Sequence, residues 1–309
     1  MRMVVAGLCM SWLLAPMAAP GQTEKPPAGT ASTVADVLAA ARAEDWRTPD
    51  AENTLYVELP GGRVVIELAP LFAPQHVANV KALAREYYFD GLAVLRVQDN
   101  YVVQWGDPEV DNPQKARRIT NARHSLPAEF DRSIDEKIHF TPLPDGDVYA
   151  GEVGFSAGLP VARDRHSNRM WLVHCYGMAG AGRGDSRDSG SGAEMYVVIG
   201  HAPRHLDRNV TLFGKVLQGM ELLSSLPRGK GPMGFIEPGQ TRVPIRSIRV
   251  AADVPLAGRS DLQVLRTDTE TFRKLIEARR NRSEEWFLLQ AGRVELANVP
   301  VPVRKKETK

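Results

Sequence analysis

The sequence is poor in cysteine, has almost no net charge and carries one long apolar run, at its N-terminus. Only two cysteines, Cys9 and Cys175, occur among 309 residues, so the fold does not depend on a disulfide framework. Lys and Arg number 39 against 37 Asp and Glu, a formal charge of +2, which gives no general attraction to nucleic acid or anionic lipid. Hydrophobic residues make up 43% and charged residues 25%, as in a globular protein and unlike a disordered, collagen-like or polytopic membrane chain.

The apolar run predicts a secretory signal over residues 1–21. It opens with Arg2, continues apolar over residues 4–19 and ends at residues 20–22, Pro-Gly-Gln, which is the order of basic, hydrophobic and cleavage regions in such signals. Pro16 interrupts the run, which is shorter than the roughly 20 apolar residues of a spanning helix. We therefore expect a periplasmic or secreted protein with no stable membrane span once the signal is removed.

Cleavage of the signal is expected to leave one cysteine in the mature protein. Cys9 lies inside the signal, and the bulky Leu8 before it argues against a lipoprotein anchor at that position. Cys175 then has no partner for an intrachain disulfide, and we expect it to be buried and structural.

The segments next to the signal carry weaker patterns. Residues 22–31 are rich in Pro, Gly and Thr and predict a flexible linker. Residues 32–52 predict a short helix and a connection, because Ser32 and Thr33 form an N-cap pair ahead of apolar side chains at helical spacing, up to about Trp46.

Strand patterns begin at residue 55. Two β-rich runs, residues 55–59 and 63–68, flank a Pro-Gly-Gly turn and predict a hairpin. Pro74 suits the first turn of a helix, and a further strand is expected after Asp90-Gly91. Later strands are expected at residues 195–199, 212–216 and 245–250. Many short strands with few helices predict a mainly β fold, a closed or nearly closed antiparallel β-barrel with capping helices.

Two parts of the chain fall outside this pattern. Residues from about 108 to 170 are polar and Pro-rich, too long for a bare loop, and predict an insertion with some structure of its own. Residues 251–309 predict a C-terminal appendage of helix and strand. Its helix is expected over residues 267–282, a strand-like run over 285–296 and a frayed basic end over 304–306.

Several short blocks stand out because they occur in one order. Residues 94–97 are Val-Leu-Arg-Val and residues 101–107 are Tyr-Val-Val-Gln-Trp-Gly-Asp. Residues 177–182 are Gly-Met-Ala-Gly-Ala-Gly, and residues 192–196 are Gly-Ala-Glu-Met-Tyr. Leu206-Asp207 and a Phe-Gly-Lys-Val run at 213–216 follow. These blocks resemble those of cyclophilin-type peptidyl-prolyl isomerases, and the resemblance extends over about residues 53–250.

The resemblance implies a fold, a reaction and a set of site residues. The fold is a cyclophilin-like β-barrel, and the reaction is cis/trans isomerisation of Xaa-Pro bonds in secreted or periplasmic proteins, with proline-containing polypeptides as substrates and neither metal nor organic cofactor. Arg96 is implied as the catalytic donor, and Gln104 as the residue that orients Arg96 or holds the substrate carbonyl. The implied substrate-binding residues are Tyr101, Val102, Ala179, Glu194, Tyr196, Leu206 and Phe213.

The chain departs from the family pattern at several of these positions. Leu95 stands where the family has His, Glu194 where it has Gln, and Tyr196 where it has Phe. A carboxylate at Glu194 could pair with Arg96 and either orient the guanidinium or occupy it. The substitutions at Leu95 and Glu194 keep a second interpretation open, a non-catalytic peptide-binding chaperone or adaptor with the same fold.

Two other patterns suggest different chemistry. His201 and His205 have a spacing seen in zinc sites, but Pro203 between them prevents a regular helical face, so satisfied or exposed histidines are expected. Residues 154–158 match the G-x-S-x-G motif with Ser156 in the nucleophile position, yet no amphipathic helix follows. We expect a barrel strand and turn there. The sequence does not indicate an oligomeric state.

Overall fold

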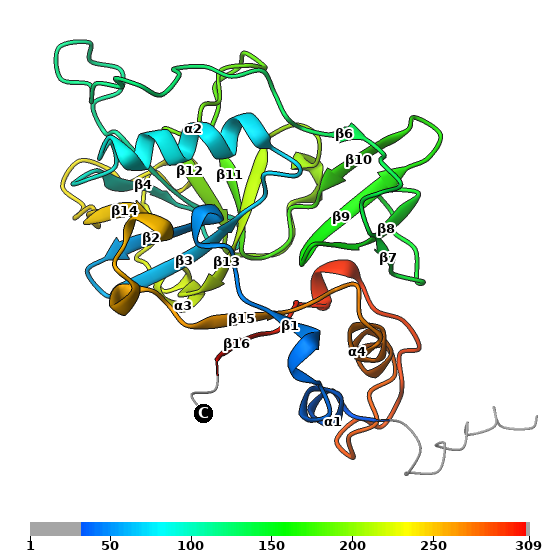
Figure 1. Ribbon diagram of the computed structural model, residues 1–309. Helices are drawn as coiled ribbons and strands as arrows, with labels where there is room; N and C mark the ends of the chain where they lie inside the picture. The colour runs from blue at the N-terminus through cyan, green and yellow to red at the C-terminus, as the bar shows by residue number, and fades with distance from the viewer. Residues whose placement is uncertain (1–31, 307–309) are drawn as a thin grey trace, which may run out of the picture.

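An eight-stranded antiparallel sheet forms the centre of the computed structural model, which describes residues 32–306. The sheet curls on itself beneath a helix (Figure 1). Its strands, in spatial order, are β14 (Ser247–Val250), β2 (Thr54–Leu59), β3 (Gly62–Leu68), β13 (Leu212–Gln218), β11 (Met178–Ala181), β12 (Met195–Val198), β5 (Val102–Gly106) and β4 (Ala93–Val97).

The predicted β fold is confirmed, but the sheet is a curled half-barrel and not a fully closed barrel. Its edge strands are β4 and β14, and the seam between them is bridged by the residues just before β14. Val94 N donates to Val243 O at 2.9 Å, and Ile245 N donates to Leu92 O at 2.7 Å. Only an isolated bridge links Ala93 to Pro244. Because proline has no N–H to donate, a continuous ladder cannot run through this position.

The hairpin and the helix after it form where the sequence predicts them. Strands β2 and β3 pair from Thr54 opposite Glu67 to Leu59 opposite Gly62. Helix α2 (Pro74–Arg85) has Pro74 in its first turn, and its buried face packs onto the barrel core. A shorter helix, α3 (Met220–Ser224), follows β13.

A carboxylate from the insertion caps α2. The N-cap residue Ala73 has no side-chain acceptor. Glu129 accepts hydrogen bonds from the backbone N–H groups of Gln75 and His76 at 3.0 and 2.9 Å, and its Oε2 lies 2.7 Å from His76 Nδ1. A carboxylate at this end also complements the helix dipole.

The insertion builds most of a second sheet. Its five strands, in spatial order, are β6 (Arg132–Ser133), β10 (Arg169–Leu172), β9 (Leu159–Asp164), β8 (Glu152–Ser156) and β7 (Thr141–Pro142). The G-x-S-x-G residues were expected in a barrel strand, and this expectation is wrong. They form β8 and its turn into β9, where Ala157 and Gly158 have positive φ angles.

The two ends of the described chain form a terminal unit. Its three-stranded sheet has the order β1 (Trp46–Arg47), β15 (Leu262–Leu265) and β16 (Val303–Lys305), and helix α1 (Val34–Ala39) packs against α4 (Glu270–Arg280). Short 3₁₀ turns connect the elements: η1 (Ala43–Asp45), η2 (Ala51–Asn53), η3 (Arg204–Leu206), η4 (Pro232–Gly234), η5 (Ala251–Asp253), η6 (Leu256–Gly258) and η7 (Leu296–Asn298).

Three expectations about the terminal unit need correction. Helix α1 ends at Ala39, because Trp46 belongs to β1. The basic end is not frayed, since Arg304 and Lys305 pair with β15. Residues 285–296 have an apolar composition typical of strands, but no strand forms there. Trp286 in this segment is 82% exposed, and no neighbouring strand offers it a ladder within the described residues.

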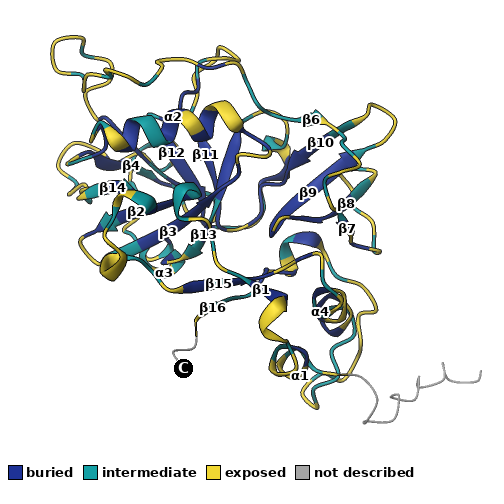
Figure 2. Cartoon of the chain, in the orientation of Figure 1, coloured by how far each residue is buried: buried dark blue, intermediate teal, exposed yellow. Residues whose placement is uncertain are grey.

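Two apolar clusters hold these parts together. One fills the barrel beneath α2. The other joins all three parts, since Tyr196 of the barrel, Phe155 of the second sheet and Phe272 of α4 belong to it. Figure 2 shows the strands dark blue at these contacts and yellow loops outside. The sheets and the terminal unit therefore share one interior.

The described residues include Cys175 but not the predicted signal and linker. Cys175 is a free, buried thiol, as expected. The signal, the linker and Cys9 lie outside the described residues. Across residues 32–306, every helix is too short or too polar to cross a bilayer.

Candidate active site

A cavity of about 330 Å³ opens on the barrel surface where β4, β5 and β12 lie side by side. Six of the nine residues implied by the sequence line it. They are Arg96, Tyr101, Val102, Gln104, Tyr196 and Leu206. The wall is completed by Gly182, Arg183, Gly184, Asp185 and Val210. The cavity thus combines the guanidinium of Arg96 and the carboxamide of Gln104 with aromatic and aliphatic side chains, and Arg183 and Asp185 add one charge of each sign to its wall.

Strand register brings the three central side chains together. Gln104 on β5 lies opposite Arg96 on β4 and opposite Tyr196 on β12. Residues that face each other across neighbouring strands project from the same face of a sheet. A shift of register between Val94 and Arg96 leaves Leu95, the residue in place of the family histidine, outside this pairing.

Arg96 is held by three acceptors. Its Nε donates to Met233 O at 2.7 Å, Nη1 donates to Gln104 Oε1 at 3.3 Å, and Nη2 donates to Gln98 Oε1. The guanidinium carbon lies 5.4 Å from the ring centroid of Tyr101 and 5.5 Å from that of Phe235. A guanidinium has five N–H bonds. Two of the five therefore have no acceptor among the described residues and are available to a ligand in the cavity.

Burial shapes the electrostatics of this guanidinium. Half-burial lowers the pKa of Arg96, while the nearby Tyr101 and Glu194 act in the opposite direction. An arginine keeps its positive charge throughout the physiological pH range despite such a shift. Partial removal from water strengthens the field of the charge at any group bound beside it.

Gln104 separates Arg96 from Glu194. Its carboxamide oxygen accepts from Arg96, and its Nε2 donates to Glu194 Oε1. The direct Arg96–Glu194 pair considered from the sequence is not formed; the two residues communicate through the amide. Burial raises the pKa of Glu194, against the opposing effects of the Gln104 hydrogen bond and the Arg96 charge. The carboxylate fixes which way the Gln104 amide faces, because it can only accept.

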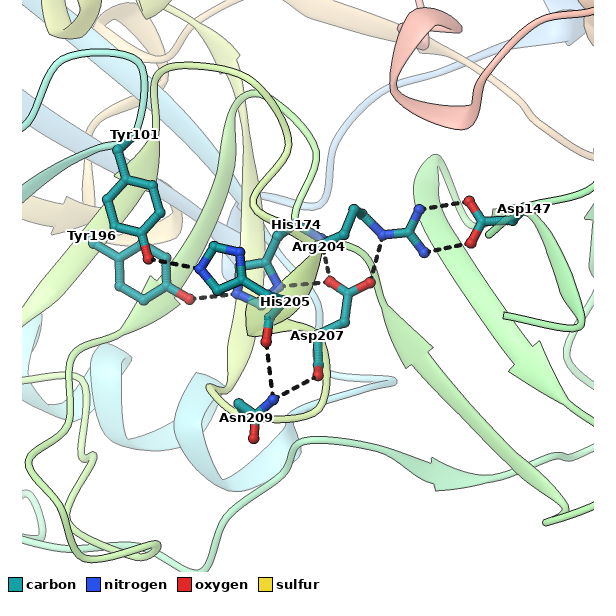
Figure 3. Close-up of polar contacts among 8 residues, drawn as sticks. All are labelled: Tyr101, Asp147, His174, Tyr196, Arg204, His205, Asp207 and Asn209. Atoms are coloured by element: carbon teal, nitrogen blue, oxygen red, sulfur yellow. Dashed lines mark hydrogen bonds and ion pairs between the residues drawn. The ribbon is translucent and has the colours of Figure 1, made fainter. Parts of the chain in front are cut away.

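Tyr196 forms the floor of the cavity and is anchored by a buried polar chain (Figure 3). Its hydroxyl lies 2.8 Å from His174 Nε2, and His174 Nδ1 lies 2.9 Å from Asp207 Oδ1. Asp207 Oδ2 accepts from Arg204 Nε at 2.7 Å, and the two Arg204 Nη atoms donate to Asp147 at 2.6 and 2.9 Å. The chain links the cavity floor to the insertion.

The protonation states in this chain follow from burial and partners. Burial lowers the pKa of His174, with the Asp207 carboxylate opposing the shift. Burial alone would raise the pKa of Asp207, but hydrogen bonds from His174 and Arg204 outweigh it and lower that pKa. A neutral His174 that donates from Nδ1 to the carboxylate presents a lone pair at Nε2. The Tyr196 hydroxyl therefore donates to His174, and its oxygen remains an acceptor.

A glycine makes room for this tyrosine. Gly180 on β11 lies opposite Tyr196, and a Cβ at position 180 would stand 2.4 Å from the tyrosine hydroxyl oxygen. Such a contact is shorter than van der Waals packing permits. The Tyr196 ring can lie across β11 only because residue 180 has no side chain.

Tyr101, which lines the cavity, lies against the ring of His205. Their rings are stacked with centroids 6.1 Å apart, and the tyrosine hydroxyl lies 3.5 Å from His205 Nε2. Leu206, the next residue, lines the cavity. His205 thus supports the ring of Tyr101 in the cavity wall.

Three of the implied residues lie elsewhere. Ala179 and Phe213 are buried in the barrel core and do not line the cavity. Glu194 does not line the cavity; its carboxylate accepts a hydrogen bond from Gln104, which does. Arg96, Gln104 and Tyr196 therefore converge on one cavity, and Phe213 does not join them.

Sequence reasoning missed several residues that support the site. His174 lies just before the 177–182 block but outside it, Asp147 lies in the insertion, and Met233 and Phe235 lie in and just after the turn η4, where no motif occurs. The usable signal was Tyr196, which stands where the family has phenylalanine. A tyrosine in place of phenylalanine needs a partner for its hydroxyl when buried, and a nearby buried histidine could have been sought.

The alternative sites are not assembled in the described residues. Ser156 is 1% exposed, so its hydroxyl is closed off from substrates. His201 is exposed, and His205 stacks on Tyr101. Within residues 32–306, no group of three or more His, Cys, Asp or Glu side chains could hold a metal ion.

Relatives of known sequence share this domain. The family model described as "Cyclophilin type peptidyl-prolyl cis-trans isomerase/CLD" matches residues 54–250. A probable peptidyl-prolyl cis-trans isomerase of Brucella suis is 28% identical over 186 residues, 58% of this chain and 74% of the relative. The peptidyl-prolyl cis-trans isomerase ppi1 of Schizosaccharomyces pombe is 23% identical over 195 residues, 63% of this chain and 94% of the relative.

A solved structure resembles more than the barrel. The crystal structure of the cyclophilin AquaCyp293 from Hirschia baltica matches with a TM-score of 0.67 and 25% identity, over 90% of this chain and 100% of that chain. This coverage exceeds the segment matched by the family model, so the likeness includes residues beyond the barrel. The family match, the relatives and the fold agree: this chain belongs to the cyclophilin-type peptidyl-prolyl cis-trans isomerase family.

Proposed function

We propose that this protein binds proline-containing polypeptides outside the cytoplasm and isomerises their Xaa-Pro bonds in the cavity between Arg96 and Tyr196. The observation that carries the proposal is the cross-strand row Arg96, Gln104 and Tyr196, which places a fixed cation beside an apolar wall in one cavity. Tyr101, Val102 and Leu206 give that wall the character that a pyrrolidine ring requires.

The chemistry of the reaction explains why such a cavity suffices. Rotation about the Xaa-Pro bond makes and breaks no covalent bond, and its barrier of roughly 20 kcal/mol comes from delocalisation of the nitrogen lone pair into the carbonyl. As the amide twists, that lone pair becomes localised on nitrogen. A donor that meets the nitrogen only in the twisted state stabilises the transition state more than either ground state.

Arg96 is suited to this role in three ways. Its charge persists at all relevant pH values. Its position is fixed before substrate arrives, because Met233 O and the two glutamine side chains already hold three of its N–H groups. A pre-oriented donor has little reorganisation to undergo during the reaction. Its remaining N–H groups supply the hydrogen bond to the proline nitrogen.

Gln104 and Tyr196 complete the proposed roles. Gln104 keeps its carboxamide oxygen toward Arg96 because Glu194 holds its amide group. Tyr196 presents its ring as a floor for proline, and its hydroxyl is directed to His174. Glu194 and His174 are therefore positioning residues that act through the groups that line the cavity.

The first experiment separates an isomerase from a binding adaptor of the same fold. Exchange between cis and trans forms of a short Ala-Pro peptide is followed by magnetisation-transfer NMR with and without protein, and binding is followed by chemical-shift changes of the peptide. An isomerase accelerates exchange at catalytic protein concentrations. Binding with no acceleration supports the adaptor, and neither effect rejects both.

The proposed location rests on residues 1–21 of the sequence. The expected order of a basic, an apolar and a cleavage region is that of an exported protein. A fusion of residues 1–31 to an alkaline phosphatase that is active only after export tests it in a bacterial host. Phosphatase activity with cleavage near residue 21 is the expected result, and an inactive, uncleaved fusion contradicts export.

A further inference from the structure

A second cavity shares no lining residue with the one beside Arg96. Its volume is about 560 Å³, which lies in the range of small-molecule sites. Lys215 of β13 and Cys175 line one side, Phe155 and Pro160 of the second sheet another, and residues from 279 to 300 the rest. In Figure 1 the red segment of this stretch passes between α4 and the two sheets.

The walls of this cavity are mainly apolar. Phe155 and Cys175 are buried, and Leu296 and Val299 from the C-terminal segment are each 1% exposed. Burial also raises the pKa of the Cys175 thiol. An apolar enclosure of this size favours a ligand with a hydrocarbon body.

The charged groups in the lining are all cations. Arg282 is paired with Glu284 at 3.6 Å. Lys215 and Arg279 form no ion pair within the described residues, and Arg279 Nε is buried with no hydrogen-bond partner there. Burial lowers the pKa of Lys215 and that of Arg279. A buried donor without an acceptor destabilises the folded protein, and an anion in the cavity would relieve that cost.

The mouth of the cavity is apolar as well. Phe287 and Leu289 belong to the lining, yet Leu289 is 79% exposed. Trp286 and Leu288 beside them are 82% and 84% exposed. Such a group of exposed apolar side chains marks an interaction site. It offers an entry for a molecule that is itself partly apolar.

We propose that this cavity binds a small amphiphilic carboxylate. The alkyl body packs against Phe155, Leu296 and Val299, and the carboxylate lies between Lys215 and Arg279. A carboxylate suits the arginine because its two oxygens accept from a guanidinium in parallel. The proposal is independent of isomerase activity, since none of these residues lines the cavity beside Arg96.

Calorimetric titration of the full protein with decanoate tests the proposal, with 1-decanol as an uncharged probe of similar length. We expect saturable 1:1 binding of decanoate that weakens at least tenfold in Lys215→Met and in Arg279→Met. The matched control is Lys274→Met, an exposed position of α4 outside the cavity. It should bind decanoate as the wild type does, and binding of 1-decanol should not distinguish the four proteins.

Three results would overturn the proposal. They are no saturable binding of decanoate by the wild type, equal affinity in all four proteins, or an equal loss in Lys274→Met, which would indicate unspecific attraction to surface charge. If Lys215→Met does not fold, the affinity of Arg279→Met for decanoate tests the proposal. Arg279 lies on α4 and not on β13, so its replacement leaves the barrel strand unchanged. Retained acceleration of Ala-Pro exchange by Arg279→Met shows that the variant is folded.

Discussion

The hydroxyl of Tyr196 and Nε2 of His174 lie 2.8 Å apart inside the protein, with both rings nearly parallel and their centroids 6.2 Å apart. His174 is 1% exposed and Tyr196 5%, so water cannot replace the hydrogen bond of either side chain if the other is removed. The floor of the candidate active site therefore depends on a residue that is not part of the cavity lining.

This pair predicts a measurable coupling. Tyr196→Phe leaves Nε2 of His174 without a donor and should lower the free energy of unfolding by about 1–3 kcal/mol. Because His174→Leu removes the same hydrogen bond, the double variant should lose less than the sum of the two single losses. Urea unfolding of the four proteins gives the coupling energy, which we expect to be at least about 0.5 kcal/mol. Strict additivity would show that the contact has no energetic importance.

A second prediction concerns the glycine beneath the tyrosine. Gly180→Ala places a methyl group 2.4 Å from the Tyr196 hydroxyl, so the ring must move away from His174. We expect Gly180→Ala to lower both stability and the rate of Ala-Pro isomerisation. Gly146→Ala is a control for the loss of a glycine, since a Cβ there meets no atom within 4 Å, although its φ of +77° adds backbone strain. An active, fully stable Gly180→Ala protein would mean that the Tyr196 ring position is unimportant.

The lowered pKa of Glu129 predicts that the free energy of unfolding falls in acid. Burial opposes ionisation of this carboxyl, but hydrogen bonds from His76 and from the backbone of Gln75 and His76 lower its pKa below the ordinary 4.5. The unfolded chain therefore takes up the proton first, and the stability supplied by Glu129 is present above pH 4.5 and disappears as pH falls through the lowered pKa. Glu129→Gln should be less stable than the wild type at pH 7 by about 1–2 kcal/mol.

Urea unfolding of both proteins between pH 7 and pH 2 checks this prediction. The gap between wild type and Glu129→Gln should close only at the acid end of the series. A gap that is constant with pH would contradict a role for the ionised carboxylate at the N-terminus of α2.

The raised pKa of Glu194 predicts the opposite dependence of stability on pH. Burial raises its pKa above 4.5 in the folded protein, so the folded state binds the proton more tightly than the unfolded chain. Its contribution is greatest below pH 4.5 and declines as pH rises through the raised pKa. In Glu194→Gln this decline should be absent, because the amide does not titrate. Unfolding measured on both proteins from pH 4 to pH 8 tests it, and parallel curves would contradict a buried, titrating Glu194.

Local signals allowed much of the barrel to be predicted from the sequence. The hairpin follows from a Pro-Gly-Gly turn between β-rich runs, and α2 from Pro74 ahead of a helical apolar face. The motif blocks at 94–97 and 101–107 placed Arg96 and Gln104 in one candidate site. Each of these inferences uses information within about 15 residues, where turn chemistry and side-chain period are informative.

The parts that were missed depend on contacts between distant segments. Strand β16 exists because β15, some 40 residues earlier, provides a ladder, and residues 285–296 lack such a partner despite a similar composition. Which face of a strand Ala179 occupies depends on a register shift between Ala179 and Gly180. Since side chains alternate with a period of two, a motif position alone does not determine whether a residue faces the cavity or the core.

The most direct test of the account is the rate of Ala-Pro isomerisation by Arg96 variants. Arg96→Ala removes the proposed donor, and we expect kcat/KM to fall by about 10²–10³-fold. Arg96→Lys keeps the charge without the fork held by Met233 O and Gln104, so it should recover only part of the rate. Arg246→Ala, an exposed arginine outside the cavity, should match the wild type. A folded Arg96→Ala protein with the wild-type rate would contradict the central claim.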